Sequence, residues 1–165
     1  MSHKTVVYPQ AKPFASTDEI EAFLTKPLIA KLCTQNKDGS THIAPVWFKY
    51  ENGEFLFGTQ EMTHKVRNIK REQRVTILVD GTDPVLQGVI AYGKAQLDFE
   101  DVIAKRIRIF EKYIGAENAP GLANKLATSW NPVVIHVKPE KMVTFDYSKG
   151  FGISKDSEAE ATPLL

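Results

Sequence analysis

Hydrophobic and polar residues alternate with a period of two along most of this chain, which is typical of strands with one buried face. The alternation predicts seven strands, at about residues 28–34, 40–50, 54–58, 74–79, 85–97, 133–137 and 142–147. The first three are joined by short turns, so they are expected to pair antiparallel. The second exceeds the average strand length, and long bent strands favour a barrel over a flat sheet. We therefore expect a mostly β fold, an antiparallel barrel with peripheral helices.

Turn residues separate these strands. Residues 36–39 (Asn-Lys-Asp-Gly) have the composition of a turn, and Asn52-Gly53 is a strong hairpin signal. Gly81, Asp83 and Pro84 predict the next turn. Gly88 and Gly93 interrupt the fifth strand, where glycines mark bulges or close backbone approach at a barrel corner.

Helical periodicity appears between and before the strands. Ser16 and Glu19 form a capping box for a first helix that Pro27 ends. A basic helix is expected at about 63–71, with Val66 and Ile69 buried. The later helices are predicted from a cap at Asp98 to Ile114, ended by Gly115, and from Pro120 to Thr128.

The whole chain, residues 1–165, is expected to form a single domain, because no repeat or linker is visible. Residues 1–14 contain Pro9 and Pro13 and are predicted to form an extended arm. Residues 154–165 lack apolar periodicity and are predicted to form a frayed tail.

Composition excludes several classes of protein. With 21 basic and 20 acidic residues, the chain lacks the charge of a nucleic-acid binder. No apolar run approaches the length of a membrane span, and the N-terminus lacks the apolar core of a signal peptide. Cys33 is the single cysteine, so no intrachain disulfide can form, which fits a cytoplasmic protein. We expect Cys33 to be a buried thiol rather than a nucleophile.

Thr63, His64 and Lys65 stand where the third strand gives way to the basic helix. Unpaired backbone N–H groups, a hydroxyl and a cation converge at such a junction, which is how a chain holds a phosphate. The alternative is that the basic residues of 64–74 form only a solvated helix face.

Other chemistries find less support. The four histidines do not have the spacing of zinc ligands, and one cysteine cannot form a thiolate cluster, so no metal site is expected; they are His3, His42, His64 and His136. The chain has no GxSxG, P-loop or GxGxxG fingerprint.

The segments THIAPVWFKY, ENG, EFLFGT and THKVRN, over residues 41–68, resemble the core of the pyridoxamine 5'-phosphate oxidase-like, FMN-binding split-barrel family. The resemblance extends over roughly residues 20–148. It implies a split barrel that forms a homodimer, with FMN bound at the subunit interface.

By this resemblance, the phosphate of the flavin would be bound by Thr59, Thr63, His64 and Lys65. His64 departs from the arginine that is commoner there, and a neutral imidazole contributes less charge. Two consequences are open by this resemblance: weaker affinity for the phosphate, or compensation by another basic residue such as Arg67. Asn68 follows the K-x-x-N spacing of the family and would orient the loop or a hydroxyl on the phosphate side.

The resemblance also places residues around the flavin ring. Pro45, Val46 and Trp47 would run beside the isoalloxazine, although Trp47 could equally be a core or interface aromatic. Gln87 would reach the flavin from the neighbouring subunit, or would simply face solvent. Trp130, beside Asn131, would line the substrate pocket, or would be an ordinary packed tryptophan.

The function implied is an FMN-dependent oxidoreductase that passes hydride or electrons between a reduced donor and a small organic substrate. No side chain stands out as an acid or base. True pyridoxamine phosphate oxidase activity is not expected, because the C-terminus lacks the family's substrate motif rich in Arg and Trp. Two alternatives remain: an F420-dependent reductase, with the acidic tail of F420 on Arg67, Lys70 and Arg71, or a non-catalytic flavin- or haem-binding stress protein.

Overall fold

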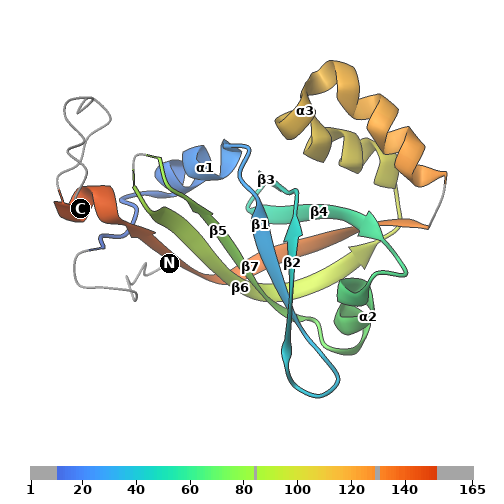
Figure 1. Ribbon diagram of the computed structural model, residues 1–165, viewed down its shortest axis with the longest axis horizontal. Helices are drawn as coiled ribbons and strands as arrows, with labels where there is room; N and C mark the ends of the chain where they lie inside the picture. The colour runs from blue at the N-terminus through green and yellow to red at the C-terminus, as the bar shows by residue number, and fades with distance from the viewer. Residues whose placement is uncertain (1–10, 84, 129–130, 152–165) are drawn as a thin grey trace, which may run out of the picture.

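The computed structural model describes residues 11–83, 85–128 and 131–151. Within them, seven antiparallel strands form one sheet flanked by helices (Figure 1). The elements, in chain order, are α1 (Thr17–Thr25), β1 (Ala30–Gln35), β2 (Thr41–Val46), β3 (Lys49–Glu51), β4 (Glu54–Gln60), α2 (His64–Arg71), β5 (Arg74–Gly81), β6 (Gln87–Asp98), α3 (Val102–Ala127), β7 (Pro132–Asp146) and α4 (Tyr147–Phe151).

The sheet curls into a split barrel, as expected. Its strand order is β2-β1-β5-β6-β7-β4-β3, so the two edge strands, β2 and β3, follow one another in the sequence. The chain therefore joins the two edges through Trp47 and Phe48, without a hydrogen-bonded ladder between them. Asn52 and Gly53 both have positive φ, 53° and 78°, as the predicted β3–β4 hairpin requires.

Two strand predictions were wrong. The strand expected over residues 40–50 is divided into β2 and β3, because the chain changes edge at Trp47 and Phe48. The two strands expected at 133–137 and 142–147 are one strand, β7, of 15 residues.

A bulge lets β7 continue past its proline. Tyr92 of β6 pairs with Lys141, while the next residue, Gly93, pairs with Pro139, so Glu140 is the extra residue. A Cβ on Gly93 would lie 2.6 Å from the carbonyl oxygen of Lys138, a contact too close for any other residue. The bulge predicted near Gly93 is thus present, with its extra residue on the neighbouring strand.

The helices follow the sequence signals with one difference, the N-cap of α3. At α1, Ser16 Oγ accepts from the backbone N–H of Glu19 at 3.2 Å, as the capping box predicts. The N-cap of α3 is Asp101 and not Asp98, whose carboxylate instead accepts from the N–H of Glu100 at 2.8 Å. The two helices predicted around Gly115 are present as the two parts of α3, which are separated by a kink at that glycine, where φ is 79° and ψ is 161° and the backbone is not helical.

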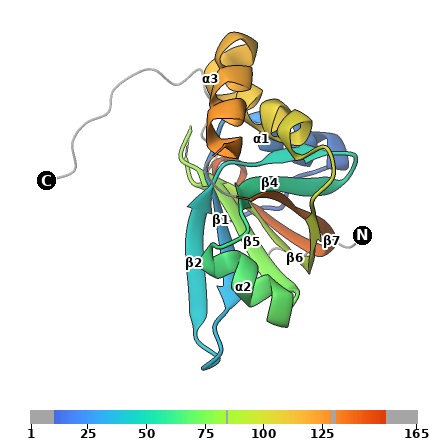
Figure 2. The same cartoon turned by 90° about the vertical axis from the view of Figure 1, so that its right-hand side faces the viewer.

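Two apolar clusters stabilise the fold. One fills the barrel, and α2 contributes Val66 and Ile69 to it. The second lies between the barrel and α3, which packs on β3, β4 and β7. Figure 2 shows α3 at one end of the molecule and α2 below it, beside β2. No helix among the described residues is long and apolar enough to cross a bilayer.

Some predictions lie outside the described residues. They concern most of the N-terminal arm (residues 1–10), Pro84, Trp130 and the C-terminal segment 154–165. Of the arm, Lys12 pairs with Asp146 of β7 and Phe14 is buried in the barrel cluster.

Candidate functional site: the junction of β4 and α2

The first turn of α2 presents backbone N–H groups with no acceptor in the described part of the chain. Thr63 is the N-cap residue, but its hydroxyl donates to the carbonyl oxygen of Gln60, at 2.9 Å, and does not cap the helix. The N–H groups of residues 64–66 therefore stay unpaired. Because they point along the positive end of the helix dipole, this turn is suited to an anion.

Lys65 lies in this turn with its charge uncompensated. It is half-buried, and within the described residues it has neither a hydrogen-bond nor an ion-pair partner. Burial lowers the pKa of its ammonium group, because water is partly removed from the charge. On the same helix, the Nζ of Lys70 is paired with Glu61 at 2.6 Å. A phosphate would supply the partner that Lys65 lacks.

Two hydroxyl groups meet at the same junction. Thr59, near the end of β4, is only 7% exposed. Its Oγ1 lies 3.4 Å from Oγ1 of Thr63, which is long for a bond between hydroxyls. The structure thus brings Thr59, Thr63, His64 and Lys65 together where β4 ends and α2 begins.

His64 has a neighbour that the sequence did not indicate. Its ring stacks on that of His42 in β2, with centroids 4.6 Å apart and planes 11° from parallel. No spacing rule connects the two residues, because the contact depends on how α2 packs beside the edge strand. His42 was considered only as a possible zinc ligand, and no group of three His, Cys, Asp or Glu in the described ranges is arranged to hold a metal.

Asn68 fixes the position of α2 against the β1–β2 hairpin. Its side chain is buried, and Nδ2 donates to Oγ1 of Thr34 at 3.1 Å and to Oδ1 of Asn36 at 2.9 Å. The Oδ1 atom of Asn68 accepts a longer bond from Arg71, at 3.4 Å. Asn68 therefore orients the hairpin that carries His42, which agrees with an orienting role rather than direct anion contact.

The predicted ring-side residues take different directions. Pro45 is exposed on the outer face of β2, while Val46 is half-buried and faces inward, opposite Ala30. Trp47 stacks on Tyr113 of α3, with centroids 4.6 Å apart and an interplanar angle of 5°, and meets Phe110 edge-on at 5.5 Å. Trp47 is thus an aromatic contact between barrel and α3.

Tyr113 also holds the link between the two edge strands. Its hydroxyl accepts from the backbone N–H of Phe48 at 3.0 Å and donates to the carbonyl oxygen of Leu28 at 2.8 Å. Burial raises the pKa of this phenol to about 12, so it stays protonated and keeps its donor. The end of β2 is therefore held by α3, a contribution that local sequence does not reveal.

Gln87 is not near the β4–α2 junction within one copy of the chain. It begins β6 opposite Gly81, whereas α2 leads into the other end of β5, at Arg74. The eight residues of β5 separate these ends by roughly 23 Å. Gln87 is also only 9% exposed and donates to the carbonyl oxygen of Asp83, so it is not the solvent-facing glutamine considered as an alternative.

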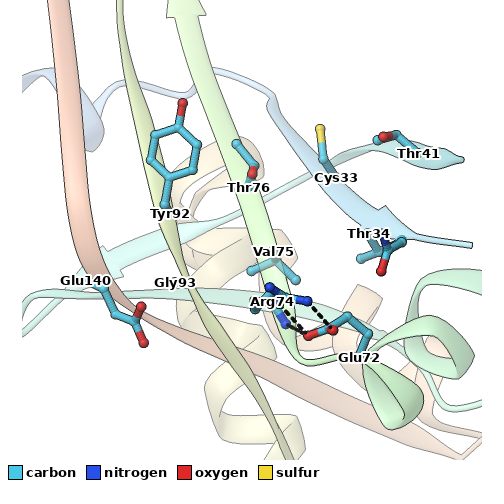
Figure 3. Close-up of a pocket in the computed structure, with 11 residues that line it drawn as sticks. Cys33, Thr34, Thr41, Glu72, Arg74, Val75, Thr76, Tyr92, Gly93 and Glu140 are labelled. Atoms are coloured by element: carbon cyan, nitrogen blue, oxygen red, sulfur yellow. Dashed lines mark hydrogen bonds and ion pairs between the residues drawn. The ribbon is translucent and has the colours of Figure 1, made fainter. Parts of the chain in front are cut away.

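A cavity of about 410 Å³ opens at the other end of α2 (Figure 3). It lies on the outer face of the sheet, where register aligns Cys33, Thr76 and Tyr92 across β1, β5 and β6. Arg74 and Glu72 close one side with a two-pronged ion pair, at 2.8 and 3.1 Å. Burial raises the pKa of the Cys33 thiol, so this cysteine is not an activated nucleophile.

A second cavity, of about 700 Å³, lies beside the start of α3. Phe99, Val102 and Ile103 give it an apolar wall, and Asn131 stands at its polar side, bonded to Glu61 at 3.3 Å. Trp130, the predicted pocket residue next to Asn131, lies outside the described residues.

Comparison with known proteins identifies the fold. A conserved hypothetical protein from Mycobacterium tuberculosis, Rv2991, superposes with a TM-score of 0.74 at 23% identity, over 92% of this chain and 96% of that one. An F420 reductase superposes with a TM-score of 0.60 at 21% identity, over 74% and 94% of the two chains.

The haem storage protein HutZ from Vibrio cholerae superposes with a TM-score of 0.64 at 12% identity, over 78% of this chain and 94% of that one. At such identities these likenesses show the fold alone. A search of curated proteins gives no match. The family model described as pyridoxamine 5'-phosphate oxidase, however, matches residues 16–145, most of the sequence. The chain therefore belongs to the pyridoxamine 5'-phosphate oxidase family.

Proposed function

We propose that this protein binds FMN at the junction of β4 and α2 and acts as an oxidoreductase on a small organic substrate. The observation that carries the proposal is the unpaired first turn of α2. There, Lys65 and the free N–H groups of residues 64–66 converge without an internal acceptor. Thr59, Thr63 and His64 complete the donor set for the phosphate, and these residue types fit a dianion.

The flavin ring would lie along β2. As an edge strand, β2 has backbone N–H and C=O groups that are not used in the sheet, and the polar edge of an isoalloxazine needs such donors and acceptors. A proline in an edge strand turns the side that lacks an N–H away from the neighbouring strand, so on this free side Pro45 offers its carbonyl oxygen to the ring.

A second copy of the chain would complete the site. Gln87 lies far from α2 in the same copy, so it can reach a flavin there only from a partner. The outer face of β1, β2, β5 and β6 is suited to such pairing because it carries Ile43, 59% exposed, and Tyr92. We therefore propose a homodimer with two equivalent flavin sites at the interface.

When bound, the flavin supplies the redox chemistry by taking up and releasing electrons. The protein holds the phosphate through Lys65 and the helix start, positions the ring against β2, and excludes water with the second subunit. No described side chain is assigned as an acid or base.

A specific observation favours FMN over F420 in this chain. Of the three basic residues considered for the acidic tail of F420, Lys70 is paired with Glu61, and Arg71 donates to the carbonyl oxygen of Gln35. Only Arg67 has no partner within the described residues. The F420 reductase among the structural neighbours keeps this alternative as the second candidate.

The absorbance spectrum of the purified protein, followed by denaturation and analysis of the released chromophore, tests the cofactor. A two-banded flavin spectrum with release of FMN supports the proposal, and a single-banded deazaflavin would replace FMN by F420. Bleaching by a reduced donor and reoxidation by an added substrate would distinguish an enzyme from a storage protein such as HutZ. A protein that binds neither cofactor when each is added would refute the proposal.

Substitution of Lys65 by alanine tests the site itself. The loss of one charged hydrogen bond to the phosphate should cost about 1.5–3 kcal/mol, which weakens FMN binding roughly 10- to 150-fold. Lys70→Ala is the matched control, because it removes an equal charge from the same helix but from a lysine already paired with Glu61. Equal FMN affinity of Lys65→Ala and the wild type, measured by quenching of flavin fluorescence, would remove Lys65 from the site.

A further inference from the structure

Two histidines lie face to face beside the start of α2. His64 is the first residue of the helix, and His42 lies on β2, so neither chain proximity nor a shared element brings them together. Their rings are nearly parallel, with centroids 4.6 Å apart. The stacking therefore places the ring of His42 beside the first residue of α2, at the unpaired helix start.

The surroundings of this pair carry positive charge without a compensating carboxylate. The charges of two residues of α2, His64 and Lys65, disfavour the protonated form of His42. On β1, the one strand that pairs with β2, the residue opposite His42 is Thr34, which has no titratable side chain. Within the described residues, neither ring of the pair has an acidic partner. By contrast, the nitrogens of His136 lie 3.0 Å from Asp98 and 3.5 Å from Glu54.

The consequence is that protonation of His42 is disfavoured. Burial, and then the charges of His64 and Lys65, lower the pKa of His42. An anion near the helix start would offset both causes, since it screens the neighbouring charges and favours the imidazolium form.

We infer that His42 is an anion-binding residue and that His42 and His64 together form a proton-dependent clamp for the phosphate group of the ligand. The inference rests on the proposed phosphate site at α2 and assigns to it a residue on a different element. In the empty site the lowered pKa of His42 keeps its ring neutral at pH 7 or above. When a phosphate binds, the pair takes up a proton and donates an additional charged hydrogen bond.

Proton uptake on binding makes the affinity depend on pH. A group whose pKa rises on binding tightens the complex as the pH falls through that raised pKa, by at most about tenfold per pH unit for one proton. FMN affinity should therefore increase between pH 8 and pH 6. The second ionisation of a phosphate ester, near pH 6, acts in the opposite direction but equally in every variant, so each variant is compared with the wild type at the same pH.

The first experiment measures the dissociation constant of FMN by fluorescence quenching from pH 8.0 to pH 6.0. The wild type should bind about 3- to 10-fold more tightly at pH 6.0 than at pH 8.0. His42→Asn should lose most of this gain while it still binds FMN at pH 8.0, and His136→Gln, a histidine outside the pair, should keep it. The variant His64→Arg carries a charge that does not titrate in this range. It should bind FMN tightly, and its affinity should depend less on pH than that of the wild type.

The second experiment does not depend on flavin. Histidine ring resonances are followed by NMR in a pH titration with and without sulfate, which stays a dianion throughout. Sulfate should raise the pKa of His42 or His64 and leave that of His136 unchanged. Such a shift, in a protein that binds no flavin, would support the clamp while refuting the cofactor.

Two results would overturn the inference. One is FMN binding with the same pH dependence in His42→Asn as in the wild type, which leaves the flavin site intact but removes the clamp. The other is an absence of any sulfate effect on either histidine in a protein that also fails to bind FMN.

Discussion

Arg106 is a charged side chain in an apolar setting. It lies on the buried side of α3, where Nη1 donates to Oε1 of Gln60 at 3.2 Å and the guanidinium lies 5.5 Å from the centre of the Phe110 ring. Among the described residues, Nε of Arg106 has no hydrogen-bond partner, and burial lowers the pKa of the guanidinium. A buried charge with no carboxylate partner pays a desolvation cost that one neutral hydrogen bond offsets only in part.

Replacement of Arg106 by methionine should therefore be tolerated. We expect the free energy of unfolding to fall by less than about 1 kcal/mol, or to rise, because methionine fills similar space without a charge. Arg106→Ala is the comparison, since it leaves a cavity and should cost about 2–4 kcal/mol. Urea denaturation of the two variants measures the difference. A loss of 3 kcal/mol or more in Arg106→Met would show that the charge itself stabilises the fold.

At the scale of single residues, part of the candidate site could be predicted from the local sequence. The strand-to-helix junction at Thr63, His64 and Lys65 could be predicted, because the end of β4 and the start of α2 are adjacent in the chain. The contact between His42 and His64 could not be, since it depends on the packing of α2 against the β1–β2 hairpin through Asn68.

At the scale of elements, α3 is joined to the rest of the fold by Lys112. Its Nζ donates to the carbonyl oxygen of Leu24 in α1 at 2.8 Å and lies 3.4 Å from the centre of the Phe48 ring. Burial, and then the charge of Lys49, lower the pKa of Lys112 to about 7. Three separate segments thus meet at one ammonium group.

This lysine should make stability depend on pH. In the unfolded chain a lysine keeps its proton up to about pH 10.4. Between pH 7 and that value the unfolded state binds more protons at Lys112, so the free energy of unfolding rises with pH across this window. Urea denaturation from pH 7 to 9.5 should show a smaller rise in Lys112→Met than in the wild type. Lys125→Met, an exposed lysine of the same helix, should behave as the wild type does, and parallel curves for all three proteins would contradict the assignment.

Element boundaries were predictable where turn residues set them, and not where tertiary contacts do. Asn52 and Gly53 form the β3–β4 hairpin that the sequence predicts. The segment APVWFKY contains no turn signal after Pro45, and its break at Trp47 follows from the stacking of that ring on Tyr113, 66 positions away. The two strands predicted on either side of Pro139 are one strand, β7, because the bulge at Glu140 that accommodates this proline depends on pairing with the neighbouring strand.

At the scale of the whole molecule, the outer face of the sheet is the surface proposed for pairing with a second copy. Substitution of Ile43 by glutamate places a charge on this face and should weaken the dimer more than tenfold, because a charge would be buried without a partner. Sedimentation at several protein concentrations measures the effect. Ile103→Glu is the control, since Ile103 is 40% exposed but lies on α3, away from this face. An unchanged dimer in Ile43→Glu would place the interface elsewhere.

The two edges of this sheet are held together by a covalent link of two residues and not by a ladder of hydrogen bonds. Two strands joined by a hydrogen-bonded ladder lie about 4.8 Å apart, whereas two edges joined only by a short stretch of chain have no such fixed spacing. The spacing at the opening is therefore set by side chains at its borders, among them Trp47, Tyr113 and His42. Substitutions at those few positions can change the width of the opening to suit ligands of different size, while the pairing of all seven strands stays the same.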